Sequence, residues 1–248
     1  MLAAVLALVI AQAAPLPNAH SHNDYWRPGP LEDALALGFC SIEADVFPVD
    51  GDLLVGHAKS ELRPERTLRK LYLEPLARRI AENKGRVYPG GPEVVLLVDV
   101  KSGPQDSYRL LREQLEPLEP WLGRAEAGAL RGVLSGARDK DAVLADDGHW
   151  IGLDGRPEDL GHGYSLPAMP LVSADWNALF RWKGEGPMPS DQQLRLKDLV
   201  DRVHEEGRRL RFWGTPHRPS LWKELRAAGV DLIGADNLGM LADFLRSP

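Results

Sequence analysis

The feature that most constrains the fold of this 248-residue chain is a repeated alternation of short apolar runs with longer amphipathic stretches. Runs such as "CSIEADVFP" and "EVVLLVDVK" are each followed by a stretch of helical periodicity, for example "SYRLLREQLEPLEPWL". Strands that alternate with helices imply parallel pairing and right-handed crossovers, and about eight such units close into a barrel. The pattern therefore predicts an α/β fold of the TIM (β/α)8 type. A doubly wound open sheet is the alternative, although no G-x-G-x-x-G loop follows the first predicted strand.

Length and composition favour a single domain. With 44% hydrophobic residues the chain can bury one large core, and single barrels commonly reach this size. No linker or low-complexity tract divides the sequence. We expect one barrel domain over residues 15–248, acting as a monomer.

The charge of the chain limits its partners. A net charge of -6 argues against nucleic acid as a ligand, because phosphate neutralisation needs a basic face. It also provides no strong attraction to anionic lipid, so membrane contact stays undecided. The single cysteine excludes an internal disulfide and a cysteine-rich zinc site.

The N-terminal segment "MLAAVLALVIAQAAP" is apolar, too short to span a bilayer, and ends in an A-x-A pattern. We interpret residues 1–14 as a secretory signal peptide, although no Lys or Arg follows Met1. The alternative is a disordered or core-packed N-terminal segment. The signal peptide predicts a secreted or periplasmic protein.

Polar and aromatic residues end almost every predicted strand, which is where the functional residues of a (β/α)8 barrel gather. These residues are His20, His22, Glu43, Asp45, His57, Asp99, Lys101, Ser135, Asp154, Asp175, Trp176, Trp213, Thr215, His217, Asp236 and Asn237.

Three acids form a candidate metal site. Glu43 and Asp45 share one face of a strand because side chains alternate along an extended chain. Asp99, on a neighbouring apolar strand, adds a third oxygen ligand, and oxygen-only donors suit Mg²⁺ or Ca²⁺. An acid pair bridged by arginine is the alternative explanation.

A histidine and a lysine accompany these acids. Asp50-Gly51 predicts a turn that brings His57 back beside the acids, where it becomes a candidate general acid. Lys101 shares a face with Asp99 and is suited either to offset a phosphate charge or to form a salt bridge with the acids.

The early motifs resemble those of phosphodiesterases. "SHNDY" resembles the HN-x-Y element of phosphatidylinositol-specific phospholipase C, and "SIEADV" with "DGDLLVGH" resembles the motif of glycerophosphodiester phosphodiesterases. "HSHNDYWR", "TLRKLYLEPL" and "RFWGTP" with "GVDLIGAD" are most similar to the altered inheritance of mitochondria protein 6 family. The resemblance covers nearly the whole chain after residue 14 and is most specific in its first block.

The resemblance implies a distorted (β/α)8 barrel with a divalent cation held by Glu43, Asp45 and Asp99, and with Asn23 on the metal side. It also implies two catalytic histidines. His57 is the second, and the first is His22 or, in the glycerophosphodiesterase alignment, His20. We favour His22 because Asn23 and Tyr25 complete its motif.

These residues together predict a metal-dependent phosphoric diester hydrolase. One histidine takes a proton from water or from a substrate hydroxyl, and His57 protonates the leaving alcohol. Tyr25, Trp26, Trp176 and Trp213 are candidates for an apolar rim around the substrate, a small phosphodiester or a phospholipid head group.

Two other functions stay open. His20-Ser21-His22 has the H-x-H form of metal hydrolases related to amidohydrolases and histidinol phosphatases. Such sites need further histidines on later strands. His149, His162, His204 and His217 are available, although His204 lies in a predicted helix and His149 and His162 in predicted loops. The second alternative is a barrel that binds a phosphorylated ligand without turnover.

Overall fold

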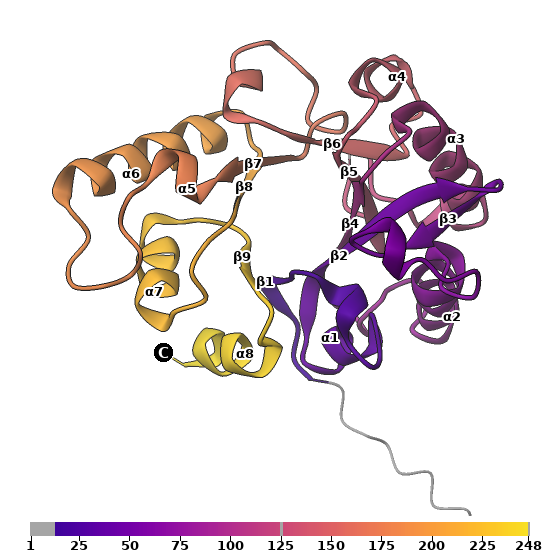
Figure 1. The fold of residues 1–248 in the computed structure, drawn as a ribbon, viewed down its shortest axis with the longest axis horizontal. Helices are drawn as coiled ribbons and strands as arrows, with labels where there is room; N and C mark the ends of the chain where they lie inside the picture. Colours follow the sequence, from indigo (N-terminus) through magenta and orange to yellow (C-terminus); the bar gives the residue numbers. More distant parts are fainter. Residues whose placement is uncertain (1–12, 125, 248) are drawn as a thin grey trace, which may run out of the picture.

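Eight parallel strands form a nearly closed barrel, with helices on its outside (Figure 1). This arrangement is that of a computed structural model, which describes residues 13–124 and 126–247. Neighbouring strands follow the order β8-β7-β6-β5-β4-β2-β1-β9. A parallel bridge between Arg211 of β8 and Leu232, next to β9, joins the two ends of this order. The predicted distorted (β/α)8 barrel is confirmed.

The strands follow the predicted apolar runs. They are β1 (Leu16–Ser21), β2 (Phe39–Val49), β3 (Asp52–Val55), β4 (Val94–Val100), β5 (Leu130–Gly136), β6 (Ile151–Gly155), β7 (Leu171–Asp175), β8 (Arg209–Trp213) and β9 (Ile233–Ala235).

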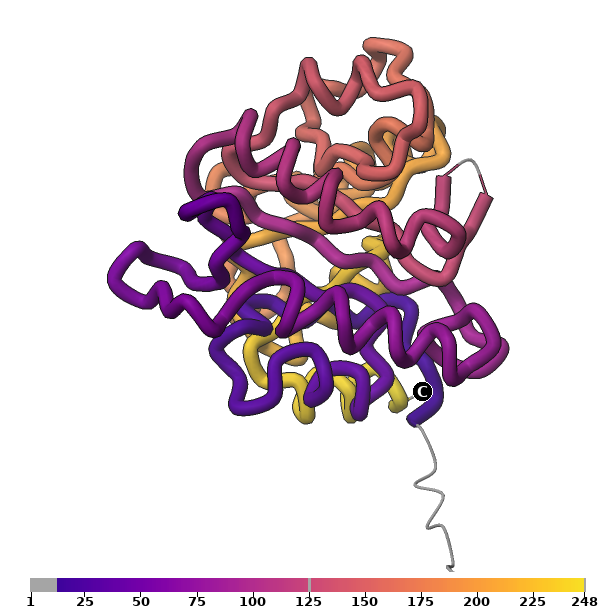
Figure 2. The backbone as a smooth tube through the Cα atoms, turned by 90° about the vertical axis from the view of Figure 1, so that its right-hand side faces the viewer, coloured from indigo at the N-terminus to yellow at the C-terminus, as the bar shows by residue number. Residues whose placement is uncertain are grey.

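The helices follow the amphipathic stretches. They are α1 (Glu32–Ala36), α2 (Glu74–Glu82), α3 (Pro104–Leu115), α4 (Lys140–Ala145), α5 (Trp176–Leu179), α6 (Ser190–Glu205), α7 (Pro219–Ala228) and α8 (Leu238–Arg246). The last of these, α8, lies beside α1 and β1 in both views (Figures 1 and 2), and Arg246 donates a hydrogen bond to the carbonyl oxygen of Leu37. None of the helices in the described ranges has the length and apolar character needed to cross a membrane.

The barrel is least regular after β6. Between Gly155 and Leu171 the chain forms a single short helical turn at Pro157–Asp159, where a crossover helix is expected. Within the strand order from β8 to β9 the pairing is also shortest here, because β6 pairs with β7 through only Asp154 and Gly155.

The strand β3 is an addition to the barrel that pairs antiparallel with β2. Asp50 and Gly51, both with positive φ, make the turn between the two strands, as the sequence predicts. The hairpin returns the chain toward the middle of β2, since Val55 pairs with Val46. His57 therefore lies beside the carboxyl-terminal half of β2.

The strand register gives the barrel an apolar end and a polar end. Along one face of β4, Val95 and Leu97 are followed by Asp99. Val95 and Leu97 pack in a small buried cluster with Val133 of β5, Leu171 of β7, and Leu232, which directly precedes β9. Because all eight strands are parallel, the polar residues that follow such apolar ones gather at one end of the barrel.

Candidate active site

Glu43, Asp45 and Asp99 form an acidic cluster at the polar end of the barrel. Glu43 and Asp45 alternate with Ala44 on β2, and Asp99 of β4 lies directly opposite Asp45 in the parallel register. One carboxylate oxygen from each of the three lies within 4.8 Å of the others. Glu43 and Asp45 are buried and Asp99 is half-buried. The three acids that the sequence selects as metal ligands therefore meet.

Two cationic side chains face this acidic cluster. Arg211 of β8 donates from Nη1 to Oε2 of Glu43 over 2.6 Å. Lys101 places its Nζ 2.8 Å from Oδ2 of Asp45 and 3.2 Å from Oδ1 of Asp99. Burial alone raises the pKa of Glu43, but Arg211 and His20 outweigh it and hold that pKa well below its ordinary value. Burial lowers the pKa of Lys101, but Asp99 and Asp45 outweigh it and raise that pKa above its ordinary value.

The acidic cluster nevertheless fits a divalent cation. Oδ1 of Asp45 is buried and accepts no hydrogen bond from any group in the described residues. An unsatisfied buried carboxylate oxygen is costly unless a donor or a cation reaches it. Burial also raises the pKa of Asp99, and Lys101 offsets this only in part. Oxygen-only donors of this kind suit Mg²⁺ or Ca²⁺.

His57 is hydrogen bonded to the acidic cluster. Its Nδ1 lies 2.8 Å from Oδ2 of Asp45, and its backbone N–H donates to Oε2 of Glu61 over 2.7 Å. The Tyr25 hydroxyl donates to the same Asp45 oxygen over 2.7 Å. About half of the His57 side chain is exposed. Its ring is therefore fixed on one side and open to solvent on the other.

His20 is buried inside the barrel. Its Nε2 lies 2.6 Å from Nη1 of Arg211 and 3.0 Å from Oε2 of Glu43, and its Nδ1 lies 2.8 Å from the Ser41 hydroxyl. Burial, followed by the Arg211 charge, lowers the pKa of His20 to about 4. The imidazole is therefore neutral at pH 7, with both ring nitrogens engaged.

His22 points to a different set of groups, which we call the histidine group: His22, His217 and Asp236. Nδ1 of His22 lies 2.7 Å from Oδ1 of Asp236, and Nδ1 of His217 lies 3.5 Å from Oδ2. Burial lowers the pKa of His22, but the hydrogen bond to Asp236 outweighs it and the pKa is raised. His20 and His22 thus belong to separate groups, which disfavours the H-x-H site as the sequence suggests it.

Asn23 lies next to Tyr25, whose hydroxyl contacts Asp45. Its Oδ1 lies 2.7 Å from the Tyr25 hydroxyl oxygen, and its Nδ2 lies 3.0 Å from Nδ1 of His22. The role of Asn23 as a metal ligand stays a prediction. Asn23 and Tyr25 form a chain of polar contacts between Asp45 and the histidine group.

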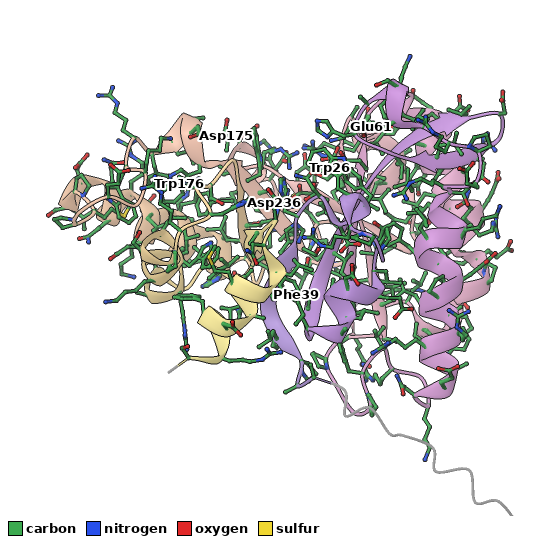
Figure 3. The ribbon with its side chains drawn as sticks, turned by 60° about the horizontal axis from the view of Figure 1, so that its bottom comes forward. Trp26, Phe39, Glu61, Asp175, Trp176 and Asp236 are labelled. Atoms are coloured by element: carbon green, nitrogen blue, oxygen red, sulfur yellow. The ribbon has the colours of Figure 1, made fainter. Side chains whose placement is uncertain are left out.

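Two of the predicted substrate-binding aromatics are buried, which is a correction. Trp176 is fully buried, stacks on Phe180 with ring centroids 4.2 Å apart, and lies away from Asp236 and Trp26 (Figure 3). Tyr25 is also buried, and its hydroxyl donates a hydrogen bond to Asp45. Trp213 and Trp26 remain exposed, at 42% and 56%.

The sequence prediction missed Arg211. This side chain is buried, and besides Glu43 and His20 it donates from Nε to the Ser173 hydroxyl over 3.2 Å. The available signal is the alternation in "RLRFW", where an arginine faces one side of a strand whose other side carries Leu210 and Phe212. An arginine buried in this way needs an acid, and Glu43 supplies it.

Comparisons of sequence identify relatives of this chain. A family model described as AIM6-like phosphodiesterase domain matches residues 9–130. The chain is 31% identical to "Altered inheritance of mitochondria protein 6" of Eremothecium gossypii, over 92% of this chain and 69% of that protein. It is 29% identical to the homolog from Arthroderma benhamiae, over 90% of this chain and 82% of that protein. The protein of the same name from Saccharomyces cerevisiae is also 29% identical, over 93% and 71%.

Comparison of structures supports the barrel. A glycerophosphodiester phosphodiesterase from Parabacteroides distasonis superposes with a TM-score of 0.57 at 16% identity, covering 92% of this chain and 97% of that chain. A protein from Silicibacter pomeroyi assigned as a glycerophosphoryl diester phosphodiesterase gives 0.59 at 12% identity, covering 95% and 94%. At these identities the likeness establishes the fold alone.

The predicted secreted or periplasmic location is wrong. The relatives carry a name that refers to the inheritance of mitochondria, not to secretion. Most of the segment interpreted as a signal peptide, residues 1–12, lies outside the described residues and gives that interpretation no support.

Proposed function

The chain belongs to the altered inheritance of mitochondria protein 6 family, and from this premise we propose that it is a metal-dependent phosphodiesterase that uses two histidines as acid and base. The family model names a phosphodiesterase domain, and both structural neighbours carry glycerophosphodiesterase names. The finer parts of the proposal, namely the metal, the histidines and the substrate, rest on the geometry of the site.

The arrangement around Asp45 carries the proposal. One of its oxygens is bonded to His57, Tyr25 and Lys101, while the other is buried and has no hydrogen-bond partner among residues 13–124 and 126–247. Such a carboxylate can hold a cation and orient a histidine at the same time. A purely structural ion pair with Lys101 does not require the second oxygen to stay unbonded.

Glu43, Asp45 and Asp99 hold the cation in this proposal. When bound, the ion supplies positive charge that polarises a phosphoryl oxygen and offsets charge built up in the transition state. Lys101 supplies a further positive charge beside the same acids. Its raised pKa keeps the amine protonated at neutral pH.

His57 acts as the general acid. With Nδ1 bonded to Asp45, the ring is held in one orientation and its Nε2 is left for the substrate. His57 then gives its proton to the alcohol oxygen as the bond from phosphorus to that oxygen breaks.

His22 acts as the general base. It takes the proton of the attacking hydroxyl, from water or a neighbouring substrate hydroxyl, as the new bond to phosphorus forms. Its side chain is 31% exposed, and Asp236 stabilises its protonated form. His20 is less suited to this role, because it is buried with both ring nitrogens engaged. We assign to His20 a structural role, in which its ring contacts Glu43 and Arg211.

The substrate in this proposal is a small phosphodiester, either a glycerophosphodiester or a phospholipid head group, bound by a monomer. The exposed rings of Trp26 and Trp213 support an apolar surface for the leaving alcohol. The Trp26 ring lies beside the His57 ring, with centroids 5.6 Å apart. A leaving group protonated by His57 would therefore contact Trp26.

Hydrolysis assays test this function. We would measure hydrolysis of bis(p-nitrophenyl) phosphate and a panel of glycerophosphodiesters with EDTA, Mg²⁺ or Ca²⁺. His57→Gln and His22→Gln should each lower the rate by about 10²–10⁴-fold, as expected when a general acid or base is lost. The matched control is His204→Gln. His204, on α6, forms a histidine–aspartate pair with Asp231, away from the acidic cluster. Its rate should equal that of the wild type.

Three outcomes would overturn the proposal. Hydrolysis that continues in EDTA would show that the reaction does not need a metal ion. Hydrolysis that continues in His57→Gln would show that His57 is not the general acid. Tight binding of a phosphodiester without hydrolysis under any metal would instead support a binding protein.

A further inference from the structure

The histidine group brings together side chains of metal-binding type from the segments that follow three different strands. His22 follows β1, His217 lies after β8, and Asp236 directly follows β9. A ligand atom from each lies within 4.8 Å of the other two. The two imidazole rings are 6.0 Å apart, with planes inclined by 72°, and the Asp236 carboxylate faces both. In Figure 3 Asp236 lies between the part of the barrel that carries Trp176 and the part that carries Trp26.

Nδ1 of His217 makes two long polar contacts with Asp236. Nδ1 of His217 lies 3.5 Å from the Asp236 carboxylate and 3.5 Å from the Asp236 backbone nitrogen. Both distances exceed the ordinary range for a good hydrogen bond of this kind. Ligand atoms around a tetrahedral zinc ion, bound at about 2.1 Å, lie roughly 3.4 Å apart. The spacing of His217 and Asp236 therefore matches metal ligands better than hydrogen-bond partners. His22 and Asp236, with Nδ1 and Oδ1 2.7 Å apart, are at hydrogen-bond distance and would separate slightly to bind the same ion.

The donor set differs from that of the acidic cluster. Two imidazole nitrogens and one carboxylate favour borderline transition metals, whereas three carboxylates favour Mg²⁺ or Ca²⁺. All three side chains are partly exposed. His22 and His217 also line a pocket of about 220 Å³ with Trp213 and Thr215, which gives an ion and its remaining ligand a route to the site.

We propose that His22, His217 and Asp236 form a second metal site, which takes an ion of the Zn²⁺ class and leaves its fourth position open to the pocket. Binding there would engage Nδ1 of His22 in place of its contact with Asp236, so that the proton of the neutral ring lies on Nε2 and this nitrogen can no longer accept the proton of the attacking hydroxyl. If His22 is the base of the proposed function, Zn²⁺ at this site inhibits hydrolysis. The inhibition rests on the proposed function, but the binding does not.

Zinc binding without substrate tests the site itself. Purified protein is titrated with Zn²⁺ against a chromogenic chelator, in excess Mg²⁺ added to compete with Zn²⁺ for the acidic cluster. We expect one Zn²⁺ per chain, with binding weakened by at least about 100-fold in His217→Gln and in Asp236→Asn, because each removes a ligand. The wild-type affinity should persist in His204→Gln, which alters another histidine–aspartate pair, and in Asp99→Asn, which alters the acidic cluster.

Co²⁺ provides a check that does not depend on affinity. Its visible absorption should indicate nitrogen ligands in the wild type and change in His217→Gln, with circular dichroism showing that the variant is folded. Unchanged zinc affinity in His217→Gln would overturn the site. Loss of zinc binding in Asp99→Asn with His217→Gln unaffected would place the ion in the acidic cluster and also overturn it.

Inhibition is measured separately. With each protein compared to its own zinc-free rate, the Zn²⁺ concentration that halves hydrolysis should rise by at least about 100-fold in His217→Gln, in parallel with its affinity. Zinc binding at this site without any effect on the rate would overturn the inhibition. A protein that binds Zn²⁺ as described but hydrolyses no diester would contradict the proposed function and leave the metal site standing.

Discussion

The acidic cluster and the histidine group lie at the same end of the barrel but are built differently. The acids stand on β2 and β4, in strands whose register pairs Asp45 with Asp99. They are largely buried, and Arg211 and Lys101 compensate most of their charge. The residues of the histidine group lie on the segments that follow β1, β8 and β9 and are partly exposed. Its two histidines both face the one carboxylate of Asp236.

The two groups should therefore differ in how much they contribute to folding stability and in how readily they bind protons, metal ions or substrate. Buried charges on strands must be paired within the fold, since an unpaired one is costly. Partly exposed groups after strand ends can exchange a hydrogen bond for a proton, a metal ion or a substrate at small cost to the fold. We therefore expect substitutions in the acidic cluster to affect folding and chemistry together. Substitutions in the histidine group should affect mainly chemistry.

The largest expected effect is that of Glu43→Gln. It leaves Arg211 buried without its carboxylate, which should lower the free energy of unfolding by about 3–5 kcal/mol. Urea denaturation measures the change. In a double-mutant cycle, adding Arg211→Gln should recover part of the loss, because the second change removes the unpaired charge. A decrease in the free energy of unfolding below about 1 kcal/mol in Glu43→Gln would contradict this prediction, because it would show that the pair of Glu43 and Arg211 behaves like a solvent-exposed salt bridge.

The next effect is that of the cation. Mg²⁺ or Ca²⁺ at about 100 times its Kd should raise the free energy of unfolding by about 2.7 kcal/mol, through preferential binding to the folded state. The gain should disappear in Asp99→Asn and persist in Asp236→Asn. Thermal or urea unfolding with and without EDTA measures it. Equal gains in both variants would show that the ion does not bind in the acidic cluster.

The two early histidines should respond to pH in opposite directions in metal-free protein. The pKa of folded His20 is about 4, below its ordinary value of 6.5, so the unfolded chain takes up this proton first. Its contribution to stability is thus lost as the pH falls from about 6.5 toward 4. The pKa of His22 is raised, so its contribution is present below 6.5 and is lost as the pH rises through the folded value. NMR titration of the imidazole protons checks this, and a common midpoint near 6.5 would contradict it.

The smallest effect is that of Asp236→Asn on stability. The carboxylate is half exposed, so its loss should change the free energy of unfolding by no more than about 1 kcal/mol. The same substitution should lower the pKa of His22, because it removes the hydrogen bond that raises it. Urea denaturation and NMR titration of one sample report both. A larger loss of stability would show that the histidine group is as structural as the acids.

Much of the fold and half of the site could be predicted from the sequence. The alternation of apolar runs with amphipathic stretches determines strand, helix and parallel order, because each run must bury its apolar side chains. Within one strand, alternation alone places Glu43 and Asp45 on a common face. The turn at Asp50-Gly51 is also local, and it brings His57 back beside Asp45.

Only the tertiary structure decided which side chains meet across the barrel. Arg211 reaches Glu43 because closure brings β8 near β1 and β2, although 168 positions separate the two residues. His22 joins Asp236 over a separation of 214 positions, because β1 pairs with β9. The burial of Trp176 is likewise a property of packing. A sequence determines the face on which a residue lies, whereas its partner depends on strand order and closure, and these follow from the packing of the whole barrel.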